Sequence, residues 1–369
     1  MNRPVITGAA VISALGRSLA ATREALDAGR SAIAPISGDG IDPSRRDVSP
    51  AARIGPFTTD PELPRAKARR LDLGSQYAIV AARQCLADAG YEMAGREERT
   101  GILLGTGSAG AGPLTEFERQ MVVESPEAAS PFLFPNTVAN APASQVALEL
   151  KIKGPNVTIT QKDPAPLNAL FYGRMLLADE RADAFLVGAA DEWNREYHLG
   201  YERVHATRTS RRPGFVVGEG AALVLVESEK AALARGAKVL ARVAAVVSRG
   251  VPITPQKRRA DPEILAAVIR DVLKEAGVSP KEIGLVHLNR NGSPGVDEAE
   301  EKALESVFGA PFASLPTRAI KEQIGENPAI GAIQLALAAR ALADDPSLGA
   351  VLIETFGAGG NFIAAVLVK

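Results

Sequence analysis

The sequence is poor in the residues that build disulfides and cysteine-rich metal sites, with one cysteine, three histidines and one tryptophan among 369 residues. A single thiol excludes an internal disulfide and a metal site built from several cysteines. That thiol, Cys85, lies in a helical pattern over residues 76–89 that Gly90 closes, so we expect a packed structural cysteine. The sequence therefore predicts no metal site.

Long apolar runs and an excess of charge are also missing. No run reaches the roughly 18 apolar residues of a membrane-spanning helix, and the formal net charge is −1. This balance gives no indication of a nucleic-acid or membrane partner. Residues 1–8 lack the apolar region of a signal peptide and lead directly into a strand pattern. We therefore expect a cytoplasmic protein.

The chain does contain an alternation of short β-rich runs and helical patterns, which favours an α/β fold. The expected strands are residues 102–105, 157–159, 184–188, 221–226, 239–247, 284–287, 350–353 and 363–368. The expected helices are residues 19–28, 75–89, 143–150, 166–178, 263–276, 296–307 and 329–342. Residues 36–64 and 251–262, rich in Pro, Asp and Arg, are expected to be loops. A charged, alanine-rich helix at residues 228–238 separates two comparable series, so we divide the chain into halves 1–230 and 231–369.

Four segments, in order along the chain, resemble segments of the β-ketoacyl-ACP synthases, the condensing enzymes of fatty-acid and polyketide synthesis. They are residues 5–16 (VITGAAVISALG), 130–140 (SPFLFPNTVAN), 212–221 (RPGFVVGEGA) and 356–361 (FGAGGN). In the family these are the first strand and turn, a segment near the dimer interface, a signature that opens a hairpin, and a glycine-rich turn. The resemblance implies the thiolase fold, in which two related βαβαβαββ halves stack as five αβαβα layers.

Active members of this family use a cysteine and two histidines, and this chain replaces all three. Residues 154–160 and the helix after them resemble the family's nucleophile turn, with Asp163 at the cysteine position. A thiolate there takes the acyl chain as a thioester, which a carboxylate cannot form. The histidines promote decarboxylation of malonyl-ACP and stabilise the oxyanion. Their positions align with Asn289 and Glu326.

Residues around these positions keep the family's frame. Lys321 matches the lysine of the family segment that ends in the second histidine. Glu300 matches a residue of the acidic pair that follows the first histidine. We expect Lys321 and Glu300 to lie close together as a buried structural ion pair. His287 lies two residues from Asn289, and we expect it to miss the site. The resemblance also places four turn residues at the site: Phe356, Gly357, Ala358 and Gly359.

We expect Asp163, Asn289, Glu326 and Lys321 to converge between the two halves. Lys321 would then neutralise a carboxylate, because an unpaired buried charge is costly.

The chain lacks the nucleophile but keeps the rest of the family's pattern. In this respect it resembles the chain-length factors, the ketosynthase β subunits of type II polyketide and aryl-polyene-type synthases. Residues 161–170 (QKDPAPLNAL) share the Leu-x-Ala-Leu ending of their turn. The resemblance implies a non-catalytic subunit that pairs with an active ketosynthase, or with itself, and works with an acyl carrier protein. It implies no cofactor.

The same resemblance indicates where a partner would bind. Phe132, Phe134 and Asn136 are expected at the dimer interface or the tunnel for the growing chain. The edge of strand 156–160 is expected to pair across a two-fold axis. Ala358 stands where the family often has a bulky gating phenylalanine, which suggests that this gate is no longer used.

Two other functions stay open at this point. An enzyme with altered chemistry would use Asp163, Glu326 and Lys321, because two close carboxylates can have their pKa values pushed apart and divide acid and base roles. A homodimeric module that binds an acyl group or a carrier protein is the other alternative. A neighbouring gene for a ketosynthase with an intact Cys-His-His set would favour the partner role.

Three further features have a structural explanation. Residues 105–110 (GTGSAG) match the spacing of a dinucleotide-binding turn, but no acidic residue ending a second strand follows about 20 residues later. His198 and His205 lack metal-ligand spacing and are expected in a polar loop. The basic clusters 65–70 and 257–259 are expected to be solvated, with docking of an acidic carrier protein as the functional alternative.

Overall fold

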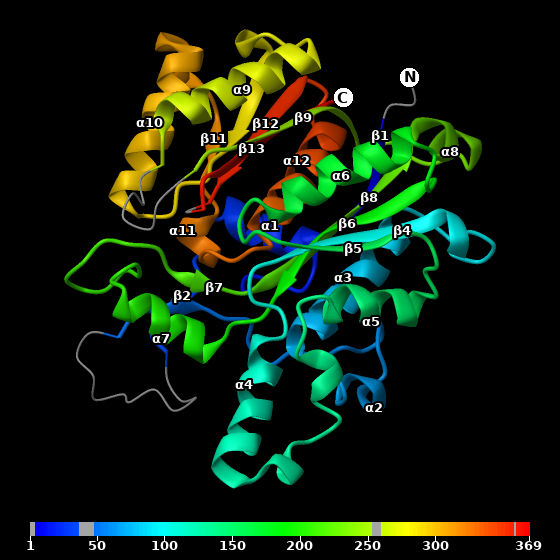
Figure 1. Cartoon of the computed structure of the whole chain (residues 1–369). Helices are drawn as coiled ribbons and strands as arrows, with labels where there is room; N and C mark the ends of the chain where they lie inside the picture. Colours follow the sequence, from blue (N-terminus) through cyan, green and yellow to red (C-terminus); the bar gives the residue numbers. More distant parts are fainter. Residues whose placement is uncertain (1–3, 37–47, 253–259, 358) are drawn as a thin grey trace.

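The computed structural model describes residues 4–36, 48–252, 260–357 and 359–369, and these form one ten-stranded sheet with helices on its faces (Figure 1). The N-terminal half supplies β1 (Pro4–Ser13), β4 (Thr100–Thr106), β5 (Asn156–Thr160), β6 (Ala184–Asp191) and β8 (Gly220–Ser228). The C-terminal half supplies β9 (Ala241–Gly250), β10 (Ile283–His287), β11 (Thr317–Arg318), β12 (Ala350–Phe356) and β13 (Asn361–Val368). The expected gate position Ala358 and the basic cluster 257–259 lie outside the described residues.

The two halves have the same strand topology. The strands run β5-β4-β6-β8-β1 in one half and β11-β10-β12-β13-β9 in the other, so the strand order within each half is identical. The last strand of each half, β8 or β13, is antiparallel to both of its neighbours. Val5 and Ile6 of β1 pair with Arg242 and Ala241 of β9, and this short seam joins the halves into one sheet. The topology thus displays the internal duplication, which the sequence was too divergent to show.

Helices form three layers around these two half-sheets. α3 (Leu73–Asp88) and α5 (Ala141–Leu150) cover the outer face of the N-terminal half, and α9 (Pro262–Ala276) and α10 (Pro294–Phe308) cover that of the C-terminal half. α6 (Ala165–Ala178) and α12 (Ile330–Asp344) lie between the half-sheets. Each helix layer has its own cluster of buried apolar side chains. This is the five-layer αβαβα arrangement expected from the sequence.

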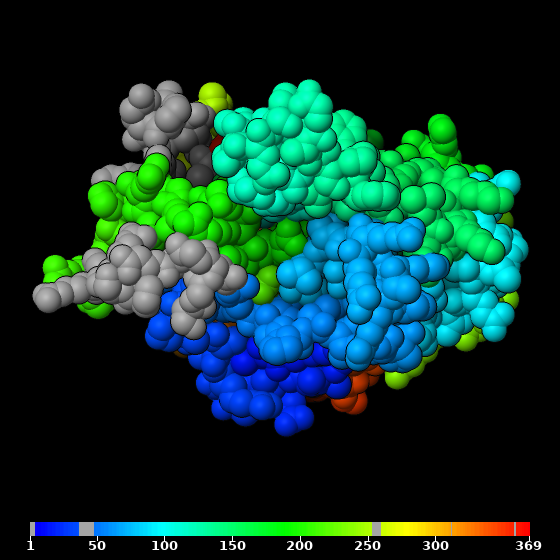
Figure 2. Space-filling model, turned by 90° about the horizontal axis from the view of Figure 1, so that it is seen from below, coloured from blue at the N-terminus to red at the C-terminus, as the bar shows by residue number. Residues whose placement is uncertain are grey.

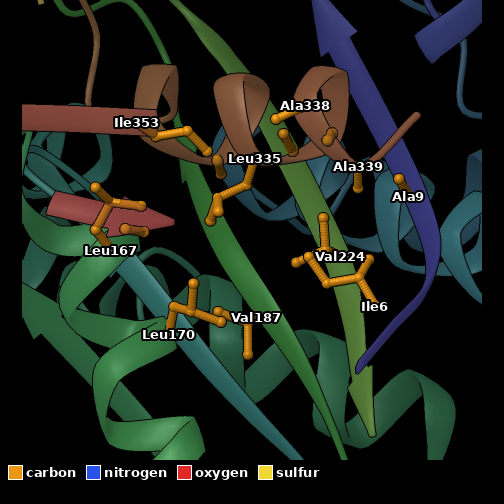
Figure 3. Close-up of a cluster of buried hydrophobic side chains, with 14 of the residues drawn as sticks. Ile6, Ala9, Leu167, Leu170, Val187, Val224, Leu335, Ala338, Ala339 and Ile353 are labelled. Carbon is orange, nitrogen blue, oxygen red and sulfur yellow. The ribbon is translucent and has the colours of Figure 1, made fainter. Parts of the chain in front are cut away.

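The middle layer has the largest of these clusters. Figure 3 shows Leu167 and Leu170 of α6 and Leu335 of α12 packed against side chains of the strands. Val187 of β6 and Val224 of β8 are among these side chains. Both helices are apolar around most of their circumference because each meets a sheet on two sides. Full burial of one leucine contributes roughly 1.5–3 kcal/mol. This packing fixes the beginning of α6, next to Asp163.

The remaining elements are shorter. Five helices complete the body or its surface: α1 (Leu19–Asp27), α2 (Arg65–Ala68), α7 (Arg195–Arg203), α8 (Glu229–Ala234) and α11 (Lys321–Ile324). A second, three-stranded sheet contains β2 (Ile33–Ala34), β3 (Ala51–Ala52) and β7 (Val217–Gly218). Of the helices in the described part of the chain, none is long and apolar enough to cross a membrane.

Two expectations about local structure were wrong. The segment 212–221 does not open a hairpin, because β7 pairs with β3 in the small sheet while β8 belongs to the large one. β3 also interrupts the stretch 36–64 that was expected to be a loop. Pairings of two residues between distant segments leave no periodic pattern in the sequence, so propensity alone could not reveal them.

His198 was also misplaced by the sequence. It lies within α7 and is fully buried, with Trp193 Nε1 3.4 Å from its Nδ1 and Glu202 Oε1 3.6 Å from its Nε2. α7 is strongly polar outside this contact, which is why the segment resembled a loop. His205 follows α7 and is exposed, as expected.

One helical segment projects from the body of the protein. α4 (Ala111–Arg119) is followed by a π-turn at Gln120–Glu124 and a 3-10 turn at Pro126–Ala128. We call residues 111–129 the arm. It extends below the sheet in Figure 1 and forms a teal prominence in the view from below (Figure 2). No residue of the arm is buried.

Candidate functional site

Asp163 lies in a tight turn between β5 and α6. The preceding residue, Lys162, has a φ of 55°, in the left-handed region that few residues with side chains adopt. This conformation turns the chain from the strand into the helix within four residues. The side chain of Asp163 is 13% exposed and points toward Lys321. The turn is retained, but it presents a carboxylate.

Lys321 connects the positions that replace the triad. Its Nζ lies 2.7 Å from Asn289 Oδ1, 3.1 Å from Asp163 Oδ2 and 3.4 Å from Glu326 Oε2. The lysine side chain is only 1% exposed, so its ammonium group is almost completely shielded from water. The two carboxylates compensate the charge of this group. The structure therefore brings Asp163, Asn289, Glu326 and Lys321 into one cluster, which we call the lysine cluster. Asp163 comes from the N-terminal half and the other three residues from the C-terminal half.

The lysine cluster holds one cation between two carboxylates. Burial and, to a smaller extent, the charge of Glu326 raise the pKa of Asp163 to about 6, although Lys321 opposes both effects. Burial acts to lower the pKa of Lys321, but Asp163 and Glu326 outweigh it and hold this pKa above its ordinary value. Lys321 is therefore charged at neutral pH. Asp163, with a pKa of about 6, can take up a proton close to neutral pH.

Glu326 is positioned by the small sheet. Its backbone N–H donates to Val216 O at 2.6 Å, and Gly218 N–H donates to its carbonyl oxygen at 2.8 Å. Its carboxylate accepts a second, short hydrogen bond from Asn291 Nδ2. These contacts fix the side chain at the position where the family resemblance places a histidine.

The expected ion pair between Glu300 and Lys321 was wrong. Glu300 and Glu354 both accept from the backbone N–H of Asn289, and burial raises the pKa of each. Lys321 has three N–H donors, and Asn289, Asp163 and Glu326 already occupy them. Glu300 therefore anchors the backbone of Asn289. It also raises the pKa of the neighbouring Glu354, which favours the protonated form of that carboxyl.

His287 does not reach the lysine cluster. It is fully buried in β10, and neither ring nitrogen has a hydrogen-bond partner among the described residues. Burial lowers its pKa to about 4, so the ring is neutral at physiological pH.

A cavity of about 590 Å³ opens beside the lysine cluster. Asp163, Glu326, Asn291 and Phe356 line it together with Lys162. Its size is in the range of small-molecule pockets. A smaller cavity of about 60 Å³ shares Lys162 and Tyr201 with it. Lys162 Nζ donates to Tyr201 Oη at 2.6 Å, and this pair contributes to the walls of both spaces.

The glycine-rich turn lies directly against the Asp163 turn. A side chain at Gly357 would have its Cβ 3.2 Å from Pro164 Cδ, which is closer than ordinary contact. Phe356 precedes it and stacks on Phe362, with ring centroids 5.6 Å apart. Gly359 is exposed and has open space around it.

The expected interface residues lie away from the lysine cluster. Phe132 and Phe134 are 79% and 60% exposed, and Phe134 contacts Phe117 of α4 with ring centroids 5.7 Å apart. Asn136 is buried, and its Nδ2 donates to Arg70 O at 3.0 Å. Asn136 thus anchors this segment to the chain that follows α2 and exposes almost no surface to a partner.

The turn that resembles a dinucleotide-binding motif is occupied by the protein itself. The carboxylate of Asp191 accepts from Ser108 N at 2.7 Å, Gly107 N at 3.2 Å and Thr106 Oγ1 at 2.9 Å. These are donors that a phosphate would need. Cys85 is fully buried, as expected for a packed thiol.

Three residues of the site were missed by the sequence. Asn291 and Tyr201 carry no signal, because their partners Glu326 and Lys162 are distant in the sequence. Glu354 did carry one, since it is the single charged residue in the apolar strand β12. A charge in such a strand predicts a buried polar partner.

Residues 1–232 match the β-ketoacyl synthase N-terminal domain and residues 241–347 match the C-terminal domain. The chain belongs to the β-ketoacyl synthase family.

Similar proteins include 3-oxoacyl-(acyl-carrier-protein) synthase 2 of Coxiella burnetii, which is 26% identical over 96% of this chain and 89% of its own length. The synthase of the same name from Staphylococcus aureus (strain COL) is 27% identical over 95% and 88%. Among solved structures, the ishigamide ketosynthase/chain length factor covers the whole chain with a TM-score of 0.88 and 26% identity, and 99% of that chain is covered. A β-ketoacyl synthase from Burkholderia phymatum STM815 has the same TM-score at 23% identity and full coverage of both chains. These likenesses establish the thiolase fold of a ketosynthase-like protein.

Proposed function

We propose that this chain is a non-catalytic ketosynthase-like subunit, a chain-length factor, that pairs with an active β-ketoacyl-ACP synthase in type II polyketide, polyene or fatty-acid-like chain elongation. The observation that carries the proposal is the ion pair of Asp163 with Lys321 at 3.1 Å. It occupies the turn where the family resemblance places the nucleophile. The likeness to the ishigamide ketosynthase/chain length factor supports this role.

The chemistry of the lysine cluster supports the absence of condensation. A thiolate attacks the acyl thioester and takes the acyl group as a new thioester while the carrier thiol leaves, and it is released as a thiolate when the acyl chain is extended. A salt-bridged carboxylate is a weak nucleophile. Asn289 and Glu326 supply no imidazole for decarboxylation or for stabilising an oxyanion. The triad positions therefore hold an amide and two carboxylates, and Lys321 compensates the charge of the carboxylates.

An acyl carrier protein is the second proposed partner. Arg69 and Arg70 follow α2, are exposed, and have no acidic partner among the described residues. Carrier proteins are acidic, so such cations favour docking by charge complementarity. A solved type II synthase structure at 19% identity contains an acyl-carrier protein in complex with its ketosynthase. We also assign Phe132 and Phe134 to the interface with the ketosynthase.

Co-expression with a ketosynthase that has an intact Cys-His-His set tests the role. We expect a stable complex that elongates acyl chains, and no product from this chain alone. Intact-mass spectrometry after incubation with acyl-ACP should show no adduct on this chain. An acyl adduct that disappears in Asp163→Asn would contradict the proposal.

One observation favours a second function, an enzyme with altered chemistry. Asp163 has a pKa of about 6 and lines an open cavity together with Glu326, so it can exchange a proton near neutral pH. Turnover of acyl thioesters by the isolated chain, lost in Asp163→Asn, would establish this alternative. The cytoplasmic location and the division after residue 230 stay predictions.

A further inference from the structure

The smaller of the two cavities beside the lysine cluster has carboxylates in its wall, and we call it the acidic cavity. It shares part of this wall, including Asp163 and Glu326, with the cavity of about 590 Å³. Asp191, the last residue of β6, and Glu192 after it add two further carboxylates. The acidic cavity has a volume of about 60 Å³. One water needs roughly 10–15 Å³ on this scale, so there is room for about four non-hydrogen atoms.

Three of these carboxylates keep an oxygen that accepts no hydrogen bond from a described residue. Glu192 Oε2 accepts from two backbone N–H groups at the beginning of α3, whereas its Oε1 accepts none. Asp163 accepts only through Oδ2 and Glu326 only through Oε2. An ionised carboxylate has about four acceptor sites, so these groups are only partly satisfied. The wall therefore offers acceptors to a ligand that donates hydrogen bonds.

A buried amide in the same wall lacks an acceptor. Asn327 lines the acidic cavity and is 3% exposed. Its Oδ1 accepts from Ala329 N at 2.9 Å, which leaves Nδ2 as the free donor, and no described residue accepts from it. A buried donor without a partner costs free energy. This observation is independent of the carboxylates, and it calls for an acceptor atom on the ligand.

The charges around the acidic cavity favour an organic cation. Lys162 Nζ, in the wall, bonds to Tyr201 Oη at 2.6 Å and forms no ion pair with a described carboxylate. Lys162 and the neighbouring Lys321 thus oppose four carboxylates. Among the described residues, no three His, Cys, Asp or Glu side chains are placed to hold a metal ion. A primary ammonium has three N–H donors and can bond to carboxylates that lie further apart.

We propose that the acidic cavity binds an aminoacyl group, a short acyl group with a primary amine next to its carbonyl. The ammonium donates to the free carboxylate oxygens, and the carbonyl oxygen accepts from Asn327 Nδ2. An aminoacetyl group, with its nitrogen, two carbons and oxygen, fits the space. A purely aliphatic acyl group would leave these polar groups buried without partners. The inference rests on the proposed work with an acyl carrier protein, whose pantetheine arm would lie in the larger cavity.

Calorimetric titration of the full chain at about pH 7.5 tests this ligand class. Burial and the neighbouring Asp72 raise the pKa of Glu192 to about 7, so most of this carboxyl is ionised at that pH. An α-amino group with a pKa of about 7.7–8.0 is still mostly protonated. The probes are pantetheine analogues that carry a glycyl or a propionyl group through an amide in place of the thioester. We expect the glycyl analogue to bind at least about tenfold more tightly, because it alone brings an ammonium to the carboxylates.

Three variants separate charge from shape. Glu192→Gln keeps the size of the side chain and an acceptor for α3, and it should weaken the glycyl analogue about tenfold. The matched control Glu305→Gln makes the same change at an exposed position of α10 and should bind like the wild type. Lys162→Met removes a like charge from the wall, so it should strengthen binding of the glycyl analogue about threefold or more. Unfolding curves show whether each variant is folded.

The contrary outcomes are distinct. Equal binding of the two analogues, or binding of neither, would show that waters satisfy the cavity and would overturn the inference. Weaker binding in Lys162→Met would assign the cavity to an anion and overturn it as well. Free glycinamide that binds as tightly as the glycyl analogue would exclude a carrier-bound group. A chain that binds the glycyl analogue but forms no complex with an active ketosynthase would overturn the proposed function and leave the ligand class standing.

Discussion

Lys321 carries the charge balance of the site. In Lys321→Met two buried carboxylates lose their cation, and we expect the free energy of unfolding at pH 7 to fall by about 3–5 kcal/mol. Denaturant unfolding measures this change. Lys321 lowers the pKa of Asp163, so this pKa is higher in the folded variant than in the folded wild type. The folded variant therefore gains more from protonation, and the deficit should shrink as pH falls from 7 toward 5.

The matched variant removes all three charges. Lys321→Met/Asp163→Asn/Glu326→Gln should recover most of the lost stability, since no uncompensated charge is left. A triple variant as unstable as Lys321→Met would show that shape, rather than charge, governs this cluster.

His287 makes the fold sensitive to acid. Burial lowers its pKa from 6.5 to about 4, so the unfolded chain binds a proton that the folded chain excludes. The contribution of the buried, neutral ring to the free energy of unfolding is present above pH 6.5 and is lost as pH falls toward 4. Relative to His287→Leu, the wild type should lose roughly 3 kcal/mol over this range. Parallel pH-dependent stability profiles for the two proteins would contradict the assignment.

Restoring a thiol at position 163 should not restore condensation. In Asp163→Cys the thiol lies near Lys321, which favours the thiolate, so alkylation by iodoacetamide is expected. Without imidazoles the decarboxylation of malonyl-ACP should be at least about 100-fold slower than in an intact ketosynthase. Product analysis by mass spectrometry checks this. Comparable rates would show that Asn289 and Glu326 replace the histidines.

At the scale of elements, β5 is the edge on which association depends. Pro155 O accepts from Ile102 N at 2.9 Å, so by alternation the N–H of Thr158 points away from β4. Thr158→Pro removes that outer donor and keeps the ladder to β4. Affinity for the partner should fall by at least about tenfold with little change in thermal stability. Thr158→Ala is the control, and equal binding by both variants would exclude strand pairing at this edge.

The elements most accessible to sequence reasoning were the long, periodic ones. The apolar helices α6 and α12 and strands such as β8 were predicted within three residues, because burial on two faces leaves dense apolar runs. α4 was not expected, since Gly112 and Pro113 in its first turn argue against a helix. The lysine cluster was located through the family frame. Its hydrogen-bond pattern, such as Glu300 bonding to Asn289, depends on side-chain direction, which spacing does not define.

At the scale of the molecule, the two halves share one middle layer. α6 belongs to the N-terminal half and α12 to the C-terminal half, and they pack against each other in one cluster. Either half alone would expose that cluster to water. We expect fragments 1–230 and 231–369 to be insoluble or unfolded when expressed separately, and to copurify when expressed together. Cooperative thermal unfolding of either fragment alone would show that the halves are independent.

The ion pair between Asp163 and Lys321 joins these halves directly, at the position where an enzyme of this family would hold its reactive group. An enzyme tolerates almost no change at such a position, because the reaction requires one particular atom there. An ion pair that only holds the two halves together requires no more than matched charge and volume. This cluster should therefore accept many combinations of residues. In chains that use it in this way, the sequence can change at the very positions by which catalytic relatives are recognised.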